Sequence, residues 1–124
     1  MTAVLLPFSS KIVTPQSLTA NITSSVLEVL GSNTMSLQIN WGTNVKNNTG
    51  TALNTTGATV TVQVSEDGIQ FSPKVEIPAF TLSSVSGSQL ILTDTIRERY
   101  VNLLITANSV TSGSIEADVS FQKA

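Results

Sequence analysis

The chain has 124 residues, of which only 11% are charged, a net charge of −2, and neither Cys nor His. This length suits a single domain with a core of its own. The absent residue types exclude Ser–His–Asp and Cys–His nucleophiles, disulfides and thiolate or imidazole metal sites, and the scattered basic residues argue against nucleic acid as a partner.

The first eight residues are apolar, with Val4, Leu5, Leu6 and Phe8 as their main hydrophobic side chains. They lack the basic residues that open a secretory signal, and no apolar run reaches the roughly 20 residues of a transmembrane helix. Because an apolar tail in water invites association, this segment is expected either to form the first strand of the sheet or to dock on another subunit. We treat residues 1–17 as a candidate docking arm of one sandwich domain over residues 1–124.

Alternation of apolar and polar residues, which is typical of half-buried strands, recurs along the chain. In chain order, the predicted strands are 18–22, 26–30, 35–41, 58–65, 69–77, 80–82, 90–93, 100–107 and 114–122. The pattern is strongest in four of them, 35–41, 58–65, 100–107 and 114–122. In 100–107 the core face carries Val101, Leu103 and Ile105, but Leu104 and Tyr100 lie opposite, so this strand is expected to be covered on both sides. Seven to nine short strands with turn residues between them predict an all-β fold, either an antiparallel β-sandwich or a jelly roll.

Trp41 ends the first strictly alternating strand, in phase with Leu37 and Ile39. This phase favours a place in the core over the alternative, a sugar-stacking platform on the surface. The polar residues 42–57 that follow show no periodicity, and Gly bounds them at both ends. Because a long loop in a compact domain tends to be functional or mobile, we expect a contact or an outward tip there.

Glu66, Asp67 and Gly68 join two predicted strands. Gly68 can take the positive φ that closes a three-residue hairpin loop, so we expect a structural turn in which Asp67 performs no chemistry. Neighbouring strand residues point to opposite faces, which prevents Glu66 and Asp67 from acting as a catalytic pair. A calcium site from Glu66, Asp67, Asp94 and Asp118 is disfavoured, because their spacing lacks the pattern of a calcium-binding loop. No catalytic, cofactor or metal residue is therefore predicted.

The segment 94–99 is the one candidate helical turn, which Asp94 could cap. Tyr100 follows it and lies out of phase with Val101, Leu103 and Ile105. Its ring is therefore expected to meet a neighbouring layer or another chain. Tyr100 completes the set of candidate protein-contact residues, which are Val4, Leu5, Leu6, Phe8 and Tyr100.

A pattern in the second half of the chain resembles known sandwich proteins. A strand leads into Ser65-Glu66-Asp67-Gly68 and then Phe71, and Arg99-Tyr100-Val101 opens a later strand. This pattern, over roughly 60–123, resembles small β-sandwich virion proteins of tailed bacteriophages, such as capsid decoration proteins, and more distantly discoidin-like sandwiches. Asn102 stands where the discoidin pattern usually has a second basic residue, so ligand binding is not carried over. The resemblance implies a sandwich and, by genomic association, a virion part.

We therefore expect a non-enzymatic structural component of a bacteriophage virion. The favoured role is a capsid-associated decoration or cementing protein, which binds capsid or other virion proteins and forms homo-oligomers, trimers among them. About a quarter of the chain is Ser and Thr, and such a charge-poor, hydroxyl-rich surface suits protein contact because little charge must be desolvated. The alternative is a receptor- or glycan-binding module of a tail or fibre, which should expose Trp41 or Tyr100 in a loop-rimmed pocket. Neither role requires a cofactor, nucleic acid or a membrane.

Overall fold

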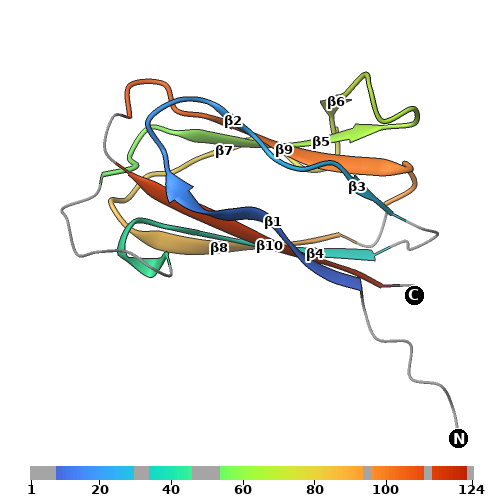
Figure 1. Ribbon diagram of the computed structural model, residues 1–124, viewed down its shortest axis with the longest axis horizontal. Helices are drawn as coiled ribbons and strands as arrows, with labels where there is room; N and C mark the ends of the chain where they lie inside the picture. Colours follow the sequence, from blue (N-terminus) through green and yellow to red (C-terminus); the bar gives the residue numbers. More distant parts are fainter. Residues whose placement is uncertain (1–7, 30–33, 46–53, 94–95, 111–112, 123–124) are drawn as a thin grey trace, which may run out of the picture.

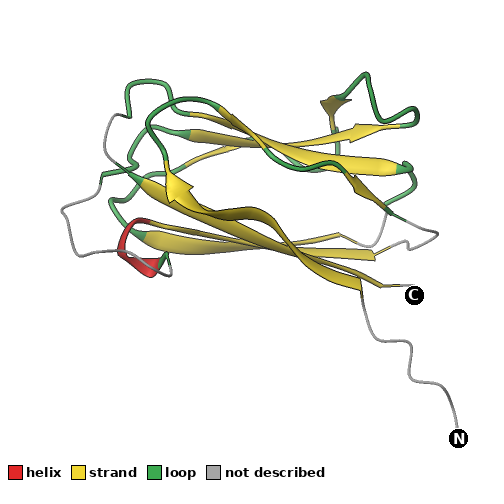
Figure 2. Cartoon of the chain, in the orientation of Figure 1, coloured by secondary structure: helices red, strands yellow, loops and turns green. Residues whose placement is uncertain are grey.

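The computed structural model describes residues 8–29, 34–45, 54–93, 96–110 and 113–122. These residues form ten strands and one short 3₁₀ turn, arranged as two sheets that pack face to face (Figure 1). Strands and their connecting loops make up nearly the whole molecule (Figure 2). The all-β sandwich predicted from the alternation is confirmed. Within the described ranges, no helix has the length and apolar character needed to cross a membrane.

Sheet A has four antiparallel strands in the order β1–β10–β4–β8. They are β1 (Phe8–Ser17), β10 (Ser114–Gln122), β4 (Thr34–Trp41) and β8 (Gly87–Thr93). The two central strands pair without interruption, from Ile115 opposite Trp41 to Gln122 opposite Thr34. β1 and β8 therefore form the two edges of this sheet.

Sheet B is built around β9 (Tyr100–Thr106) and β5 (Thr59–Ser65), which pair with each other. β2 (Ile22–Thr23) and β3 (Leu27–Glu28) follow one another along the other side of β9. β6 (Ser72–Pro73) and β7 (Phe80–Thr81) do the same along β5. If each interrupted pair is taken as one edge strand, the chain has the strand order of an eight-stranded jelly roll.

One hydrophobic core fills the space between the sheets. Because successive side chains of a strand point to opposite faces, each strictly alternating segment buries one face. Side chains that are at most 2% exposed include Leu37, Ile39, Val60, Val62, Leu103, Ile105, Ala117 and Val119. The phase assigned to the four strong strands is therefore confirmed.

The predicted docking arm over residues 1–17 requires a correction. Residues 8–17 are β1, which pairs with β10 from Phe8 opposite Phe121 to Ser17 opposite Ser114. This part of the segment belongs to the chain's own sheet, because the last strand supplies its backbone partners. Residues 1–7 lie outside the described residues, so docking through Val4, Leu5 and Leu6 stays a prediction.

The weaker patterns were less accurate. Only Ile22 of the predicted strand 18–22 is in a strand, and the predicted strand 69–77 shrinks to Ser72–Pro73. The helical turn predicted over 94–99 is not present in residues 96–99, and residues 94–95 lie outside the described residues. These segments lack strict alternation, so their local sequence could not define where pairing begins and ends.

Candidate protein-contact site

β8 is an edge of sheet A and carries exposed leucines. It pairs with β4 over its whole length without a register shift, and Ile91 lies opposite Leu37 and packs against the core. This pairing turns Leu90 and Leu92 to the outer face, where they are 54% and 69% exposed. Two apolar side chains in successive outward positions give this edge an apolar strip. We call residues 88–92 the β8 edge.

Three charged side chains meet on the outer face of sheet A. Nζ of Lys11, on β1, lies 2.8 Å from Oε1 of Glu116 and 2.9 Å from Oδ1 of Asp118, both on β10. Asn40 of β4 donates to the second Glu116 oxygen at 3.4 Å. Burial opposes the charged form of Lys11, but hydrogen bonds to the two carboxylates and their charge outweigh it and raise the Lys11 pKa. The cluster ties three neighbouring strands together.

A second ionic cluster lies at the end of the sandwich that carries β6. The Lys74 side chain is 1% exposed, and its Nζ lies 3.1 Å from Glu76 Oε1 and 3.2 Å from Glu98 Oε1. The hydrogen bond from Lys74 lowers the pKa of Glu76. Burial would raise the pKa of Glu98, but hydrogen bonds from its own N–H and from Lys74 outweigh burial and lower it. With both carboxylates engaged, this cluster is suited to holding the β6 region against the chain before β9.

Asp67 organises the turn after β5. Its Oδ1 accepts hydrogen bonds from the N–H groups of Gln70 and Ile69 and from the Ser65 hydroxyl, each at 2.9 Å. These three donors lower the pKa of Asp67. Gly68 has a φ of 76°, so the predicted left-handed turn position is confirmed. The Asp67 carboxylate is therefore used by the turn itself.

Tyr100 is half-buried beside this turn. It lies opposite Ser65 in the sheet, and a Cβ at Gly68 would come within 3.5 Å of its ring. The Arg99 guanidinium lies 5.6 Å from the ring centroid, within the range of a cation–π contact. Groups of the same chain thus occupy much of the ring's surroundings, and a contact between Tyr100 and another protein stays a prediction.

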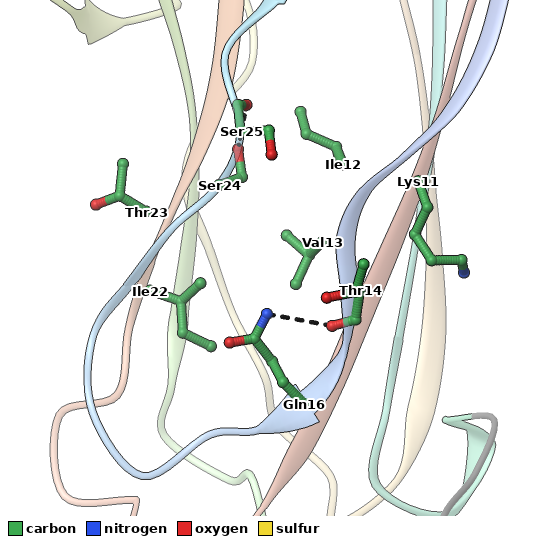
Figure 3. Close-up of a pocket in the computed structure, with 9 residues that line it drawn as sticks. All are labelled: Lys11, Ile12, Val13, Thr14, Gln16, Ile22, Thr23, Ser24 and Ser25. Atoms are coloured by element: carbon green, nitrogen blue, oxygen red, sulfur yellow. Dashed lines mark hydrogen bonds between the residues drawn. The ribbon is translucent and has the colours of Figure 1, made fainter.

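A hollow of about 170 Å³ lies between β1 and the chain around β2 (Figure 3). Its lining consists of Lys11, Ile12, Val13, Thr14, Gln16, Ile22, Thr23, Ser24 and Ser25. Gln16 donates to the Thr14 carbonyl oxygen at 3.2 Å, the contact drawn in Figure 3. The lining contains no aromatic or acidic side chain, and the volume is below the roughly 300 Å³ at which ligand pockets begin. The hollow is therefore a poor candidate for a catalytic or sugar site.

Trp41 lies in the core, as its phase with Leu37 predicts. It is 6% exposed, and its indole N–H donates to the Ser84 carbonyl oxygen at 3.2 Å. The predicted loop begins with the 3₁₀ turn Gly42–Asn44, but residues 46–53 lie outside the described residues. A contact role for residues 42–57 therefore stays a prediction.

The structure does not bring together the two members of the predicted contact set that it describes. Phe8 lies in β1 and Tyr100 in β9, on different sheets. The sequence did not identify Leu90 and Leu92 as contact residues, because the run Leu90-Ile91-Leu92 does not show which side chains face outward. The burial of Lys74 also had no sequence signal. Among the described residues, no group of three or more acidic side chains could hold a metal ion.

Comparison with known proteins identifies the fold but no family. No protein family matches the chain, and a search of curated proteins found no match. Among solved structures, the fold is similar to the crystal structure of the SPBc2 prophage-derived protein YomS, with a TM-score of 0.53. The similarity covers 98% of this chain and 100% of that chain at 10% sequence identity. At this identity the likeness shows a shared fold, one that a prophage-derived protein also adopts.

Proposed function

We propose that this protein is a non-enzymatic structural component of a bacteriophage particle, and more specifically a capsid-associated decoration or cementing protein. The observation that carries the proposal is the likeness, over nearly the whole chain, to a prophage-derived protein. Jelly rolls recur among viral capsid proteins. The sequence resemblance of residues 60–123 to phage virion proteins supports the same conclusion from separate evidence.

The outer face of sheet B supports a contact role. The outward positions of its two central strands are all uncharged. Ser65 and Asn102 are buried, and the remaining positions are Thr59, Thr61 and Gln63 on β5 and Tyr100, Leu104 and Thr106 on β9. Such a face can press against another protein without the cost of desolvating charged groups. The charged residues around this face are the exposed Glu28 on β3, opposite Tyr100, and those of the β5–β6 turn and the Lys74 cluster.

The alternative of a glycan-binding module has less support. Such a module requires an aromatic platform that a sugar can reach, but Trp41 is buried and Tyr100 packs against Gly68. The hollow beside β1 contains hydroxyl and amide groups but no ring. We therefore favour a protein surface over a sugar as the partner.

The test is to locate the protein in purified phage particles. Particles of the encoding phage or induced prophage are separated on a density gradient, then split into capsids and tails, and the protein is quantified in each fraction. We expect it to sediment with capsids in a fixed ratio to the major shell protein. Its absence from particles would overturn the proposal, and recovery with tails alone would replace the capsid role with the tail alternative.

A second experiment tests the anchor. Deletion of residues 1–7, which precede β1, should leave the melting temperature unchanged and abolish incorporation into particles. The matched variant Leu5→Ser with Leu6→Ser keeps the chain length and removes only the apolar contact. Normal incorporation of both variants would show that another surface binds the particle. A lower melting temperature on deletion would show that the segment stabilises the sandwich itself.

A further inference from the structure

Three of the four sheet edges carry features that hinder pairing with another chain. Sheet B ends on both sides in two-residue strands, and one of these, β6, contains Pro73. On the β1 edge of sheet A lie Lys11, Pro15 and two register irregularities. Short strands, charge, proline and bulges are the features by which natural sheets avoid edge-to-edge association.

β8 lacks all of these features. Its seven residues, Gly87–Thr93, include neither a charged residue nor a proline, and every one of them is paired with β4 in continuous register. Four of the seven are exposed, namely Ser88, Gln89, Leu90 and Leu92. A long, regular, apolar edge is a template for a further strand, and natural proteins that keep one commonly pair or cover it.

We propose that β8 pairs with β8 of a second copy of this chain, antiparallel, so that two A sheets join into one sheet of eight strands, four from each copy. The partner strand must itself offer a regular edge without charge, proline or bulges, and among the described strands residues 88–92 of β8 form the edge that does. Two copies that pair through the same edge are related by a two-fold axis, the commonest symmetry of protein dimers. The absence of charge on β8 also means that pairing brings no like charges together.

The side chains select the register. In an antiparallel pair, residues directly opposite each other point to the same face of the sheet. Centring the two-fold axis on Ile91 places Leu90 opposite the partner's Leu92 and Leu92 opposite the partner's Leu90. This register sets every outward leucine beside a leucine of the partner, so the two apolar strips contact each other on the outer face of the joined sheet. The contact is small, so association should depend on concentration, as it does for interfaces well below the standard size.

The inference goes beyond the virion role, since two copies can pair without any other phage protein. Sedimentation of the full chain from about 1 µM to 1 mM should show a monomer–dimer equilibrium. Leu90→Lys and Leu92→Lys, at exposed positions, should each weaken the dimer by about tenfold or more, because each substitution replaces two cross-strand leucine pairs, one on each side of the two-fold axis, with lysine–leucine pairs. Val75→Lys is the matched control, since Val75 is 90% exposed and lies outside β8. It should leave the dimer unchanged, and all three variants should melt like the parent.

The absence of cysteine allows a direct test of register. A mixture of Leu90→Cys and Leu92→Cys chains should form a disulfide between unlike chains faster than either variant does alone. Hydrogen exchange of the β8 amides should slow as concentration rises.

A chain that remains monomeric over the whole range would overturn the proposal, as would a dimer that survives both lysine substitutions. Loss of the dimer on deletion of residues 1–7, with β8 unprotected in the dimer, would assign the contact to that segment instead. A failed dimer leaves the particle-binding proposal standing, because that is tested by incorporation.

Discussion

Sheets A and B share one core, but they differ at their edges. All four strands of sheet A are continuous and seven to ten residues long, whereas four of the six strands of sheet B have only two residues. The central strands of both sheets bury an apolar inward face, because the hydrophobic effect acts on both sheets alike. This difference shows that the shared core holds the two sheets together, whereas the length and regularity of an edge strand determine whether a sheet can accept a further strand.

The two ionic clusters show a second contrast. On sheet A the most buried charged group is the Glu116 carboxylate, with a side chain 0% exposed, and its partner Lys11 is 30% exposed. At the β6 end the buried group is the Lys74 ammonium, and its partners Glu98 and Glu76 are 28% and 53% exposed. The clusters therefore respond differently when a lysine is removed, since the cost depends on how buried the remaining charge is.

The largest effects are expected in the shared core. Ile39→Ala on β4 and Leu103→Ala on β9 should each lower the free energy of unfolding by about 2–5 kcal/mol, because both side chains are at most 1% exposed. Urea denaturation measures both values, and Leu90→Ala serves as the exposed control, with an expected change within about 0.5 kcal/mol. A silent substitution at Ile39 or Leu103 would contradict the claim that the two sheets contribute alike to one core.

Replacing the more exposed lysine, Lys11, should destabilise the fold more than replacing the buried lysine, Lys74. Lys11→Met removes the lysine beside a fully buried carboxylate, and we expect a loss of about 3 kcal/mol, the low end for breaking a buried ion pair. Lys74→Met leaves carboxylates that water can reach, so a loss of about 1 kcal/mol is expected. Thermal melts of the two variants decide the order. A larger loss at Lys74 would show that burial of the lysine, and not of its partner, sets the cost.

Gly42 and Gly68 both have a positive φ, but a side chain would clash with its neighbours only at Gly42. Alanine substitutions at the two positions therefore distinguish the cost of a steric clash from the cost of backbone strain. A Cβ at Gly42, after β4, would overlap the Val85 carbonyl oxygen and the Ser86 side chain. At Gly68, after β5, it would meet the Tyr100 ring only at ordinary contact distance. Gly42→Ala should therefore cost about 1–3 kcal/mol for overpacking on top of the φ penalty, whereas Gly68→Ala should cost only the penalty of about 1 kcal/mol. Equal losses in urea denaturation would exclude the clash at Gly42.

The smallest expected effects are changes in stability with pH. The contribution of Asp67, beside sheet B, is lost in acid, whereas that of Lys11, on sheet A, is lost in alkali. The lowered pKa of Asp67 stabilises the fold above the ordinary aspartate pKa of about 4, and this contribution is lost as the pH falls through the lowered value. The raised pKa of Lys11 stabilises the fold below the ordinary lysine pKa of about 10.4, and this contribution is lost as the pH rises through the raised value.

Melting temperatures measured across pH test these signs. Asp67→Asn should melt slightly below the parent at neutral pH, since the amide oxygen can still accept the turn's hydrogen bonds but lacks the charge that strengthens them, and it should show a shallower decline in acid. Lys11→Met should show a shallower decline in alkali. If the Asp67→Asn profile in acid matches that of the parent, the carboxylate does not contribute through its charge.

The candidate site was only partly predictable. Tyr100 could be recognised as out of phase with the core, yet its packing against Gly68 depends on the turn that folds beside it. Leu90 and Leu92 could not be placed, since the pairing of Ile91 with Leu37 decides which face each residue takes. The residues of the β8 edge thus became a candidate contact only through their position beside β4.

What the sequence by itself determined is the part with a local signal: the four alternating strands, the core position of Trp41 and the turn at Gly68. A two-residue period, or a glycine between two strands, carries its meaning within a few residues. Only the tertiary structure decided that β1 pairs with the last strand, that the adjacent residues Ile12 and Val13 are both buried, and that Lys74 and Glu116 lie out of water. The physical reason is that strand partners far apart in the chain determine which backbone groups are paired and which side chains are covered.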